Sequence, residues 1–159
     1  MKMSLPQEFK IVEAMAPATD AAGRTSDYVS LKNVEKAWIL IHVTQGNAAT
    51  ILLSPLQASA VAGTGEKVLT NAVPIWSNLD TAATDTLVER TDAVNYTTDA
   101  AVKNKQVIFE IDPRHLDVEG GFDCVAFSTG ASNVANITSA QFILQMRYQQ
   151  ATPPAAITD

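Results

Sequence analysis

The segment Gln141–Gln149, with the sequence QFILQMRYQ, decides the fold class of this chain. Its apolar and polar side chains alternate with a period of two, which is the pattern of a strand with one buried face. The side chains that share the apolar face are Phe142, Leu144, Met146 and Tyr148. The segment Gln106–Asp112, QVIFEID, repeats the pattern. We therefore predict two half-buried β-strands.

A third segment, Ala37–Thr44, is apolar on both faces of an extended chain. One face carries Ile39, Ile41 and Val43, and the other carries Trp38 and Leu40. This pattern predicts a central strand covered on both sides, with Trp38 in the core and His42 as a partly buried structural imidazole.

The run Thr50–Ala58 is apolar but contains Pro55, which marks an edge position or a bulge because proline cannot donate to a ladder. The Gly46-Asn47 turn before it predicts a hairpin with Ala37–Thr44. Shorter strands are predicted at Phe9–Ala14, Tyr28–Leu31, Val73–Ser77, Thr86–Thr91 and Phe122–Ser128. About eight to nine short antiparallel strands predict an all-β fold, either a jelly roll or another β-sandwich.

The chain has 159 residues, which is the size of one domain with a core of its own. We expect an N-terminal arm over residues 1–8, a β domain over residues 9–149 and a flexible C-terminal tail over residues 150–159. The alternative for either terminus is that it becomes ordered against a neighbouring subunit.

The charge of the chain limits its partners. The formal net charge is −6 and the isoelectric point is near 4.8, with scattered Lys and Arg. Binding to nucleic acid or to an anionic membrane needs clustered positive charge, so we expect neither partner. The first residues lack the apolar run of a signal peptide, and no apolar stretch approaches the roughly 20 residues of a membrane span.

No motif with catalytic or metal-binding spacing appears in the sequence. Cys124 lies in an apolar strand and is interpreted as a small buried side chain. His115 follows Asp112-Pro113-Arg114, which predicts a turn with a surface ion pair. Gly63-Thr64-Gly65 lacks the remainder of a phosphate loop and predicts a turn. We expect no enzymatic activity, no cofactor and no bound metal.

Several stretches resemble the small decoration (cement) proteins of tailed-phage heads. They are Asp27–Asn33 leading into Ala37–Ile41, Gly46–Thr50, Gln57-Ala58, Val61–Gly65 with Lys67–Leu69, His115–Asp117 with Gly121–Val125, and Gly130–Asn136. The resemblance implies a jelly-roll-like domain on the outer face of the virion capsid. It implies binding to the major capsid protein, self-association as a dimer or trimer, and stabilisation of the expanded shell by mass action.

The residues expected to contact the capsid or a second subunit are Leu5, Phe9, Trp76 and Asn133. Deletion of residues 1–7 is expected to weaken shell binding and to leave the fold intact. The alternative function is a carbohydrate- or receptor-binding β-sandwich module of a virion. That function would be favoured if Trp76 and Tyr96 lay bare on one face.

Overall fold

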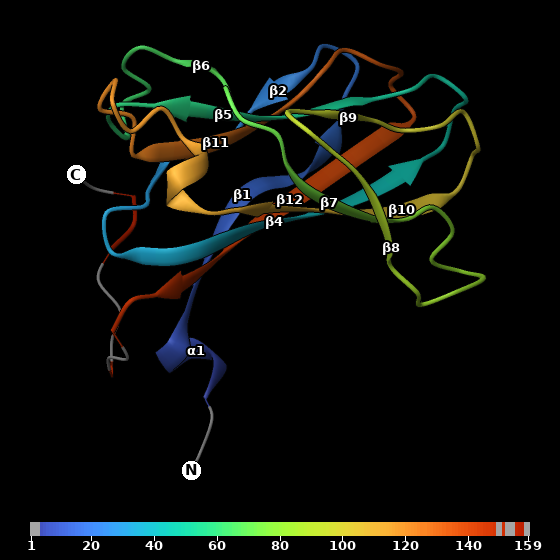
Figure 1. Ribbon diagram of the computed structural model, residues 1–159. Helices are drawn as coiled ribbons and strands as arrows, with labels where there is room; N and C mark the ends of the chain where they lie inside the picture. The colour runs from blue at the N-terminus through green and yellow to red at the C-terminus, as the bar shows by residue number, and fades with distance from the viewer. Residues whose placement is uncertain (1–3, 149–150, 152–154, 158–159) are drawn as a thin grey trace.

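The computed structural model describes residues 4–148, 151 and 155–157, and shows two facing six-stranded sheets (Figure 1). We call the first sheet A. Its strands, in spatial order, are β1 (Phe9–Thr19), β12 (Asn136–Met146), β4 (Val34–Gln45), β10 (Asn104–Ile111), β7 (Val73–Asn78) and β8 (Val88–Ala93).

The second sheet, sheet B, is built mainly from shorter strands. Its spatial order is β2 (Arg24–Thr25), β11 (Cys124–Thr129), β5 (Leu52–Ala58) and β6 (Lys67–Val68). Two further strands complete it, because β3 (Val29–Ser30) pairs with β11 and β9 (Tyr96–Thr97) pairs with β5. The described helices are α1 (Leu5–Glu8) and the 3-10 turn η1 (Pro113–His115).

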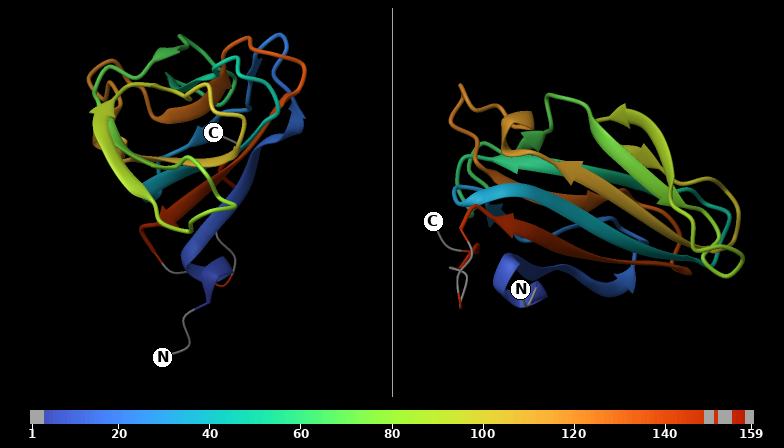
Figure 2. Two further views of the ribbon diagram at one scale, coloured as in Figure 1. Left: turned by 90° about the vertical axis from the view of Figure 1, so that its right-hand side faces the viewer. Right: turned by 60° about the horizontal axis from the view of Figure 1, so that its bottom comes forward.

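The strand pairing is that of a jelly roll. Antiparallel pairs join β1 to β12, β2 and β3 to β11, β4 to β10, and β5 to β9. These pairs alternate between sheets A and B, as in one long hairpin wrapped into two layers (Figure 2). The all-β prediction is confirmed, and of its two forms the jelly roll is the one observed. The β7–β8 hairpin extends sheet A beyond β10.

The core lies between the two sheets and follows the alternation in the sequence. One inward row crosses sheet A through Phe142, Ile39, Phe109 and Ile75, which are opposite one another in register and fully buried. Each such side chain contributes about 1.5–3 kcal/mol relative to exposure. The strand predicted at Gln106–Asp112 is confirmed as β10, and that predicted at Gln141–Gln149 is confirmed as β12 up to Met146. Tyr148, predicted on the buried face, lies beyond the strand end and is 71% exposed, and Gln149 lies outside the described residues.

The predicted hairpin at Gly46-Asn47 is wrong. Strand β4 belongs to sheet A and β5 to sheet B, so this turn crosses between the layers. A Cβ atom at Gly46 would lie 2.5 Å from the carbonyl oxygen of Ala135, so the glycine allows the turn to pass close to the next loop. The Asn47 N–H donates to Asn136 Oδ1 (2.8 Å) and not to a hairpin partner.

The prediction that Ala37–Thr44 is covered on both sides is also wrong. Strand β4 is central in sheet A, but Trp38 and Leu40 are half-exposed and His42 is exposed on the outward face. Among the described residues, only the inward face of β4 packs against another layer. Strand β4 therefore has one apolar face in the core and a second apolar face that is accessible to solvent.

The position of Pro55 follows from its missing N–H group. Pro55 lies opposite Phe127 of β11, whose N–H donates to Ser26 Oγ (2.9 Å) instead of to β5. The nitrogen of Pro55 therefore faces the other edge of β5. At that edge, β9 pairs with residues 52–53 and β6 pairs with residues 56–57, which leaves the proline unpaired between them.

The strand count is twelve within the described residues, against the eight to nine predicted. The additional strands β2, β6 and β9 have two residues each, too few to show alternation. In the C-terminal segment, Ala156 is buried and its carbonyl accepts the Ser30 N–H (2.7 Å). Parts of the predicted arm and tail, residues 1–3, 149–150, 152–154 and 158–159, lie outside the described residues.

Candidate functional site

The structure places the four predicted contact residues at three separate positions. Leu5 is 54% exposed in α1, and Phe9 is half-buried at the start of β1. Trp76 is half-buried in β7, on the outward face of sheet A. Asn133 lies in the loop between β11 and β12.

Leu5 and Phe9 lie far from the Asn133 loop. The Thr19 hydroxyl at the far end of β1 donates to the carbonyl of Val134, the residue after Asn133 (2.9 Å). Since β1 runs from Phe9 to Thr19, the two positions are about 33 Å apart at the rise of an extended strand. A single compact contact does not include both.

Leu5 and Phe9 instead belong to an apolar patch that the sequence did not reveal. Ile11 is 44% exposed and lies opposite Ile143, which lies opposite Trp38 in turn. The Phe9 and Trp38 rings are 6.1 Å apart between centroids. Leu5 joins this surface through α1, whose last turn is closed by a hydrogen bond from the Phe9 N–H to the Leu5 carbonyl. We call Leu5, Phe9, Ile11, Trp38 and Ile143 the arm patch.

A charged rim borders the arm patch on one side. The Lys36 ammonium lies 5.4 Å from the centroid of the Trp38 ring and forms an ion pair with Glu110 on the neighbouring strand. The cation holds the indole in place by an electrostatic attraction to the ring face. An apolar centre with a polar rim is the usual organisation of a protein–protein contact.

The structure corrects the predicted roles of two side chains on β4. Trp38 is not in the core but in the arm patch, and His42 is exposed instead of partly buried. The physical reason is the register of β4. Ile39 and Ile41 occupy the inward positions, so their neighbours along the strand point outward.

The two aromatic residues of the alternative function do not share a face. Trp76 belongs to sheet A, whereas Tyr96 belongs to sheet B and packs against the hydrophobic core. Both are half-buried. The structure therefore does not provide the bare Trp76–Tyr96 face that this function would use.

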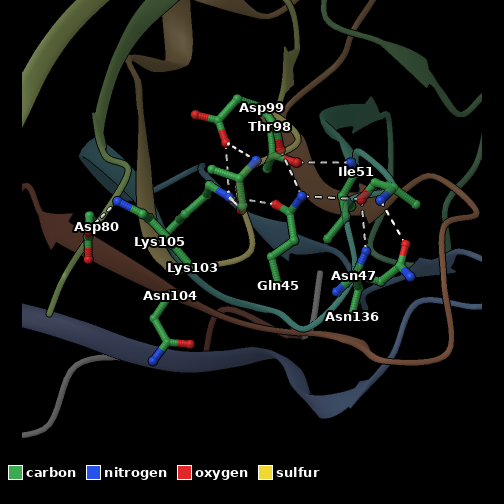
Figure 3. Close-up of polar contacts among 12 residues, drawn as sticks. Gln45, Asn47, Ile51, Asp80, Thr98, Asp99, Lys103, Asn104, Lys105 and Asn136 are labelled. Carbon is green, nitrogen blue, oxygen red and sulfur yellow. Dashed lines mark hydrogen bonds and ion pairs between the residues drawn. The ribbon is translucent and has the colours of Figure 1, made fainter.

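A buried polar cluster fixes the loops at the Asn133 end of the molecule (Figure 3). Lys105 is fully buried, and its ammonium donates to Gln45 Oε1 (2.8 Å) and to the carbonyl of Ala101, and pairs with Asp99 (3.1 Å). Gln45 Nε2 donates to the carbonyl of Asp99 (2.7 Å). The three contacts of the lysine ammonium join β4, the 98–101 loop and β10, so this cluster holds the loops in place.

Asn136 extends the same arrangement towards the neighbouring loops. Its Oδ1 accepts the Asn47 N–H, and its Nδ2 donates to the carbonyl of Ala49 (2.8 Å) and to Ser132 Oγ (2.9 Å). The loop that carries Asn133 is thus joined to the β4–β5 connection.

The titratable groups with shifted pKa values lie in pairs that stabilise loops. The hydrogen bond from Lys67 Nζ (2.5 Å) lowers the pKa of the Asp117 carboxyl, as does the Gly120 N–H. Burial, together with the hydrogen bond to Glu66 (2.6 Å), raises the pKa of Tyr28 above its ordinary range.

The other residues that sequence analysis singled out are structural. Cys124 is buried, as predicted. Asp112 caps η1 and pairs with Arg114 (2.9 Å), which confirms the predicted turn with a surface ion pair. Within the described part of the chain, no group of three or more His, Cys, Asp or Glu side chains is placed to hold a metal ion. None of the described helices has the length and apolar character needed to cross a membrane.

Comparison with known proteins found no matching family model and no matching curated protein. Among solved structures, the SPBc2 prophage-derived protein YomS is similar, with a TM-score of 0.49 and 7% identity over 87% of this chain and 94% of that chain. A structure described as "CBM4 structure and function" has a TM-score of 0.31 and 11% identity over 87% of this chain and 71% of that chain. At these TM-scores and identities, neither likeness bears on function.

Proposed function

We propose that this chain is a non-enzymatic structural protein of a phage virion that binds the outer surface of the capsid and stabilises it. Two lines support this decoration role. The first is the resemblance of its turns and strands to capsid-decoration proteins, and the second is the arm patch.

The arm patch is the observation that carries the proposal. It combines the helical turn α1, which projects beyond sheet A (Figure 1), with accessible apolar side chains on the outward face of β1, β12 and β4. Aromatic and aliphatic side chains that remain exposed together are typical of sites where another protein binds. Leu5 and Ile11 are the most exposed members, so we propose that they enter the interface first.

The partner of the arm patch is proposed to be the major capsid protein. A protein that binds the expanded shell, but not the unexpanded or ruptured one, lowers the free energy of the expanded state by mass action. No reaction is required. Self-association into a dimer or trimer would let several arm patches bind one shell, so that weak single contacts sum to firm attachment.

The test compares capsid binding by matched surface variants. Leu5→Ser, Ile11→Ser and deletion of residues 1–7 are each expected to weaken binding to expanded heads roughly tenfold, the effect of losing about 1.4 kcal/mol at an interface. Val134→Ser is the matched control, because Val134 is 69% exposed and lies at the opposite end of β1. Thermal unfolding of every variant verifies that the fold is retained.

Two results would count against the arm patch. One is unchanged capsid binding by the truncated protein and by Ile11→Ser. The other is a loss of binding in Val134→Ser equal to that in Ile11→Ser, which would indicate contact through the opposite end of the molecule.

A further inference from the structure

A second feature of the outward face of sheet A lies beside the arm patch and is chemically different from it. A groove of about 340 Å³ runs across β1, β12, β4 and β10. Its polar lining side chains are Glu13, His42, Gln106, Ser139 and Gln141, and its apolar lining includes Leu40 and Pro17. We call these residues the sheet groove.

The shape of the sheet groove follows from the irregular edge strand. The register of β1 against β12 shifts twice after Glu13, first before Met15 and again before Ala18. Such bulges bend an edge strand and redirect its side chains. Here the bent segment, with Pro17, lines the groove together with side chains of β12, β4 and β10.

The polar side chains of the sheet groove have no partners within the described residues. None of the five makes a side-chain hydrogen bond or an ion pair with another described residue. The buried polar side chains behave differently: Asp20 and Asn136, both 0% exposed, each make several hydrogen bonds, whereas the groove side chains are accessible and remain available to a ligand. Five converging hydrogen-bonding groups that the fold does not use are the usual polar component of a ligand site.

The chemistry of these groups selects the class of ligand. Two amides, an imidazole and a hydroxyl provide both donors and acceptors, which matches a ligand carrying several hydroxyl groups. The sheet groove contains no Lys or Arg, and Glu13 adds a negative charge to a chain of net charge −6. An anionic ligand is therefore disfavoured by charge repulsion.

An apolar row leads from the sheet groove to an indole ring. Leu40 lies opposite Ile108, and Ile108 lies opposite Trp76 on the next strand. These side chains offer apolar contact to the C–H face of a sugar ring, and Trp76 offers a flat aromatic surface. From Glu13 to Trp76 the row crosses four strand spacings, or about 19 Å, which is the length of a short oligosaccharide.

We propose that the sheet groove binds an uncharged oligosaccharide. Gln141 and His42 form hydrogen bonds to its hydroxyl groups, and Leu40 and Trp76 pack against its ring faces. This inference goes beyond the decoration role and does not depend on it, because the sheet groove and the arm patch are made of different side chains, although they adjoin on the outward face of sheet A.

The test is isothermal titration calorimetry of the purified full chain with neutral tetrasaccharides of glucose, galactose, mannose or N-acetylglucosamine. A sialylated tetrasaccharide is the anionic comparison. We expect saturable binding of at least one neutral tetrasaccharide, a change in tryptophan fluorescence on binding, and no binding of the sialylated one. Gln141→Ala and His42→Ala should each weaken binding at least tenfold.

Gln145→Ala is the matched control, because Gln145 lies on the same face of β12 but outside the sheet groove. It should bind the tetrasaccharide as the wild type does, and thermal unfolding verifies that all variants are folded. The proposal is overturned if no neutral tetrasaccharide binds at millimolar concentration, if only the sialylated one binds, or if Gln145→Ala loses as much affinity as Gln141→Ala. Capsid binding by Gln141→Ala, measured separately, stays unchanged whether or not the sheet groove binds sugar.

Discussion

Replacement of Asp20 by alanine is predicted to destabilise the fold strongly. Asp20 follows β1, and its side chain is 0% exposed. Its Oδ1 accepts hydrogen bonds from Arg24 Nε (3.2 Å), from the terminal Arg24 nitrogen (3.0 Å) and from Thr129 Oγ1 (3.0 Å). Its Oδ2 accepts one from Thr138 Oγ1. This carboxylate therefore joins β11 of sheet B to β12 of sheet A.

The size of the effect follows from what the substitution leaves behind. Asp20→Ala removes the acceptor of two buried hydroxyl groups and the counter-charge of a guanidinium whose side chain is largely buried. Removal of one partner of a buried ion pair lowers the free energy of unfolding by about 3–5 kcal/mol. Arg24 still donates to the carbonyls of Ala16, Ala18 and Thr138, so we expect the lower end, about 3 kcal/mol. That corresponds to a fall in Tm of about 6–12 °C for a domain of this size.

Circular dichroism during heating and urea titration measure this change. Asp20→Asn is the matched control, because it keeps the shape and one acceptor oxygen, so its loss should be smaller than that of Asp20→Ala. A loss below about 1 kcal/mol for Asp20→Ala, the range of exposed ion pairs, would contradict a stabilising role for this buried carboxylate between the sheets.

Three further predictions concern single residues. Lys105→Met should lower the free energy of unfolding in urea by about 2 kcal/mol, because the buried Gln45 Oε1 loses its donor. Methionine fills the volume and Asp99, 45% exposed, regains water, so the loss should stay below that of Asp20→Ala. A loss below about 0.5 kcal/mol would contradict this. Gly23→Ala should lower the free energy of unfolding by more than about 1 kcal/mol in the same assay, because Gly23 has φ of +71° and a Cβ atom would lie 2.7 Å from a backbone oxygen. An unchanged free energy of unfolding would show that this position tolerates a side chain. Lys67→Met should raise the pKa of Asp117 towards 3.8 in an NMR titration. The ionised Asp117 stabilises the fold above pH 3.8, and this stabilisation is lost as the pH falls through the lowered pKa of the folded state. The variant should therefore lose less folding stability in acid than the wild type. An unchanged pKa of Asp117 would contradict the pairing with Lys67.

The strands with strict alternation were predictable from the sequence, whereas their arrangement was not. Phe142 and Phe109 identify β12 and β10 because burial of every second residue is a local property. The pairing of β1 with β12 joins residues more than 100 positions apart, such as Phe9 and Gln145. The turn at Gly46-Asn47 can also be predicted from the local sequence. The sheet that the next strand joins cannot, because the turn is held by distant residues, Ala135 and Asn136.

The candidate surfaces were predictable only in part, for a similar reason. Alternation separates Trp38 from Ile39, but it does not tell which of two apolar faces receives the second sheet. Ile143 occupies the mostly polar face of β12, and Ile11 shares its face of β1 with Phe9 and Glu13, so neither marks a patch until the strands are paired. The sheet groove depends on the bulges in β1, which no residue pattern marked.

The most direct test of the proposed decoration role is co-sedimentation of the purified wild-type protein with expanded tailed-phage heads that carry no decoration protein. Unexpanded heads serve as the comparison. We expect saturable binding to expanded heads only, at a fixed ratio to the capsid subunits. Absence of binding to either kind of head would contradict it.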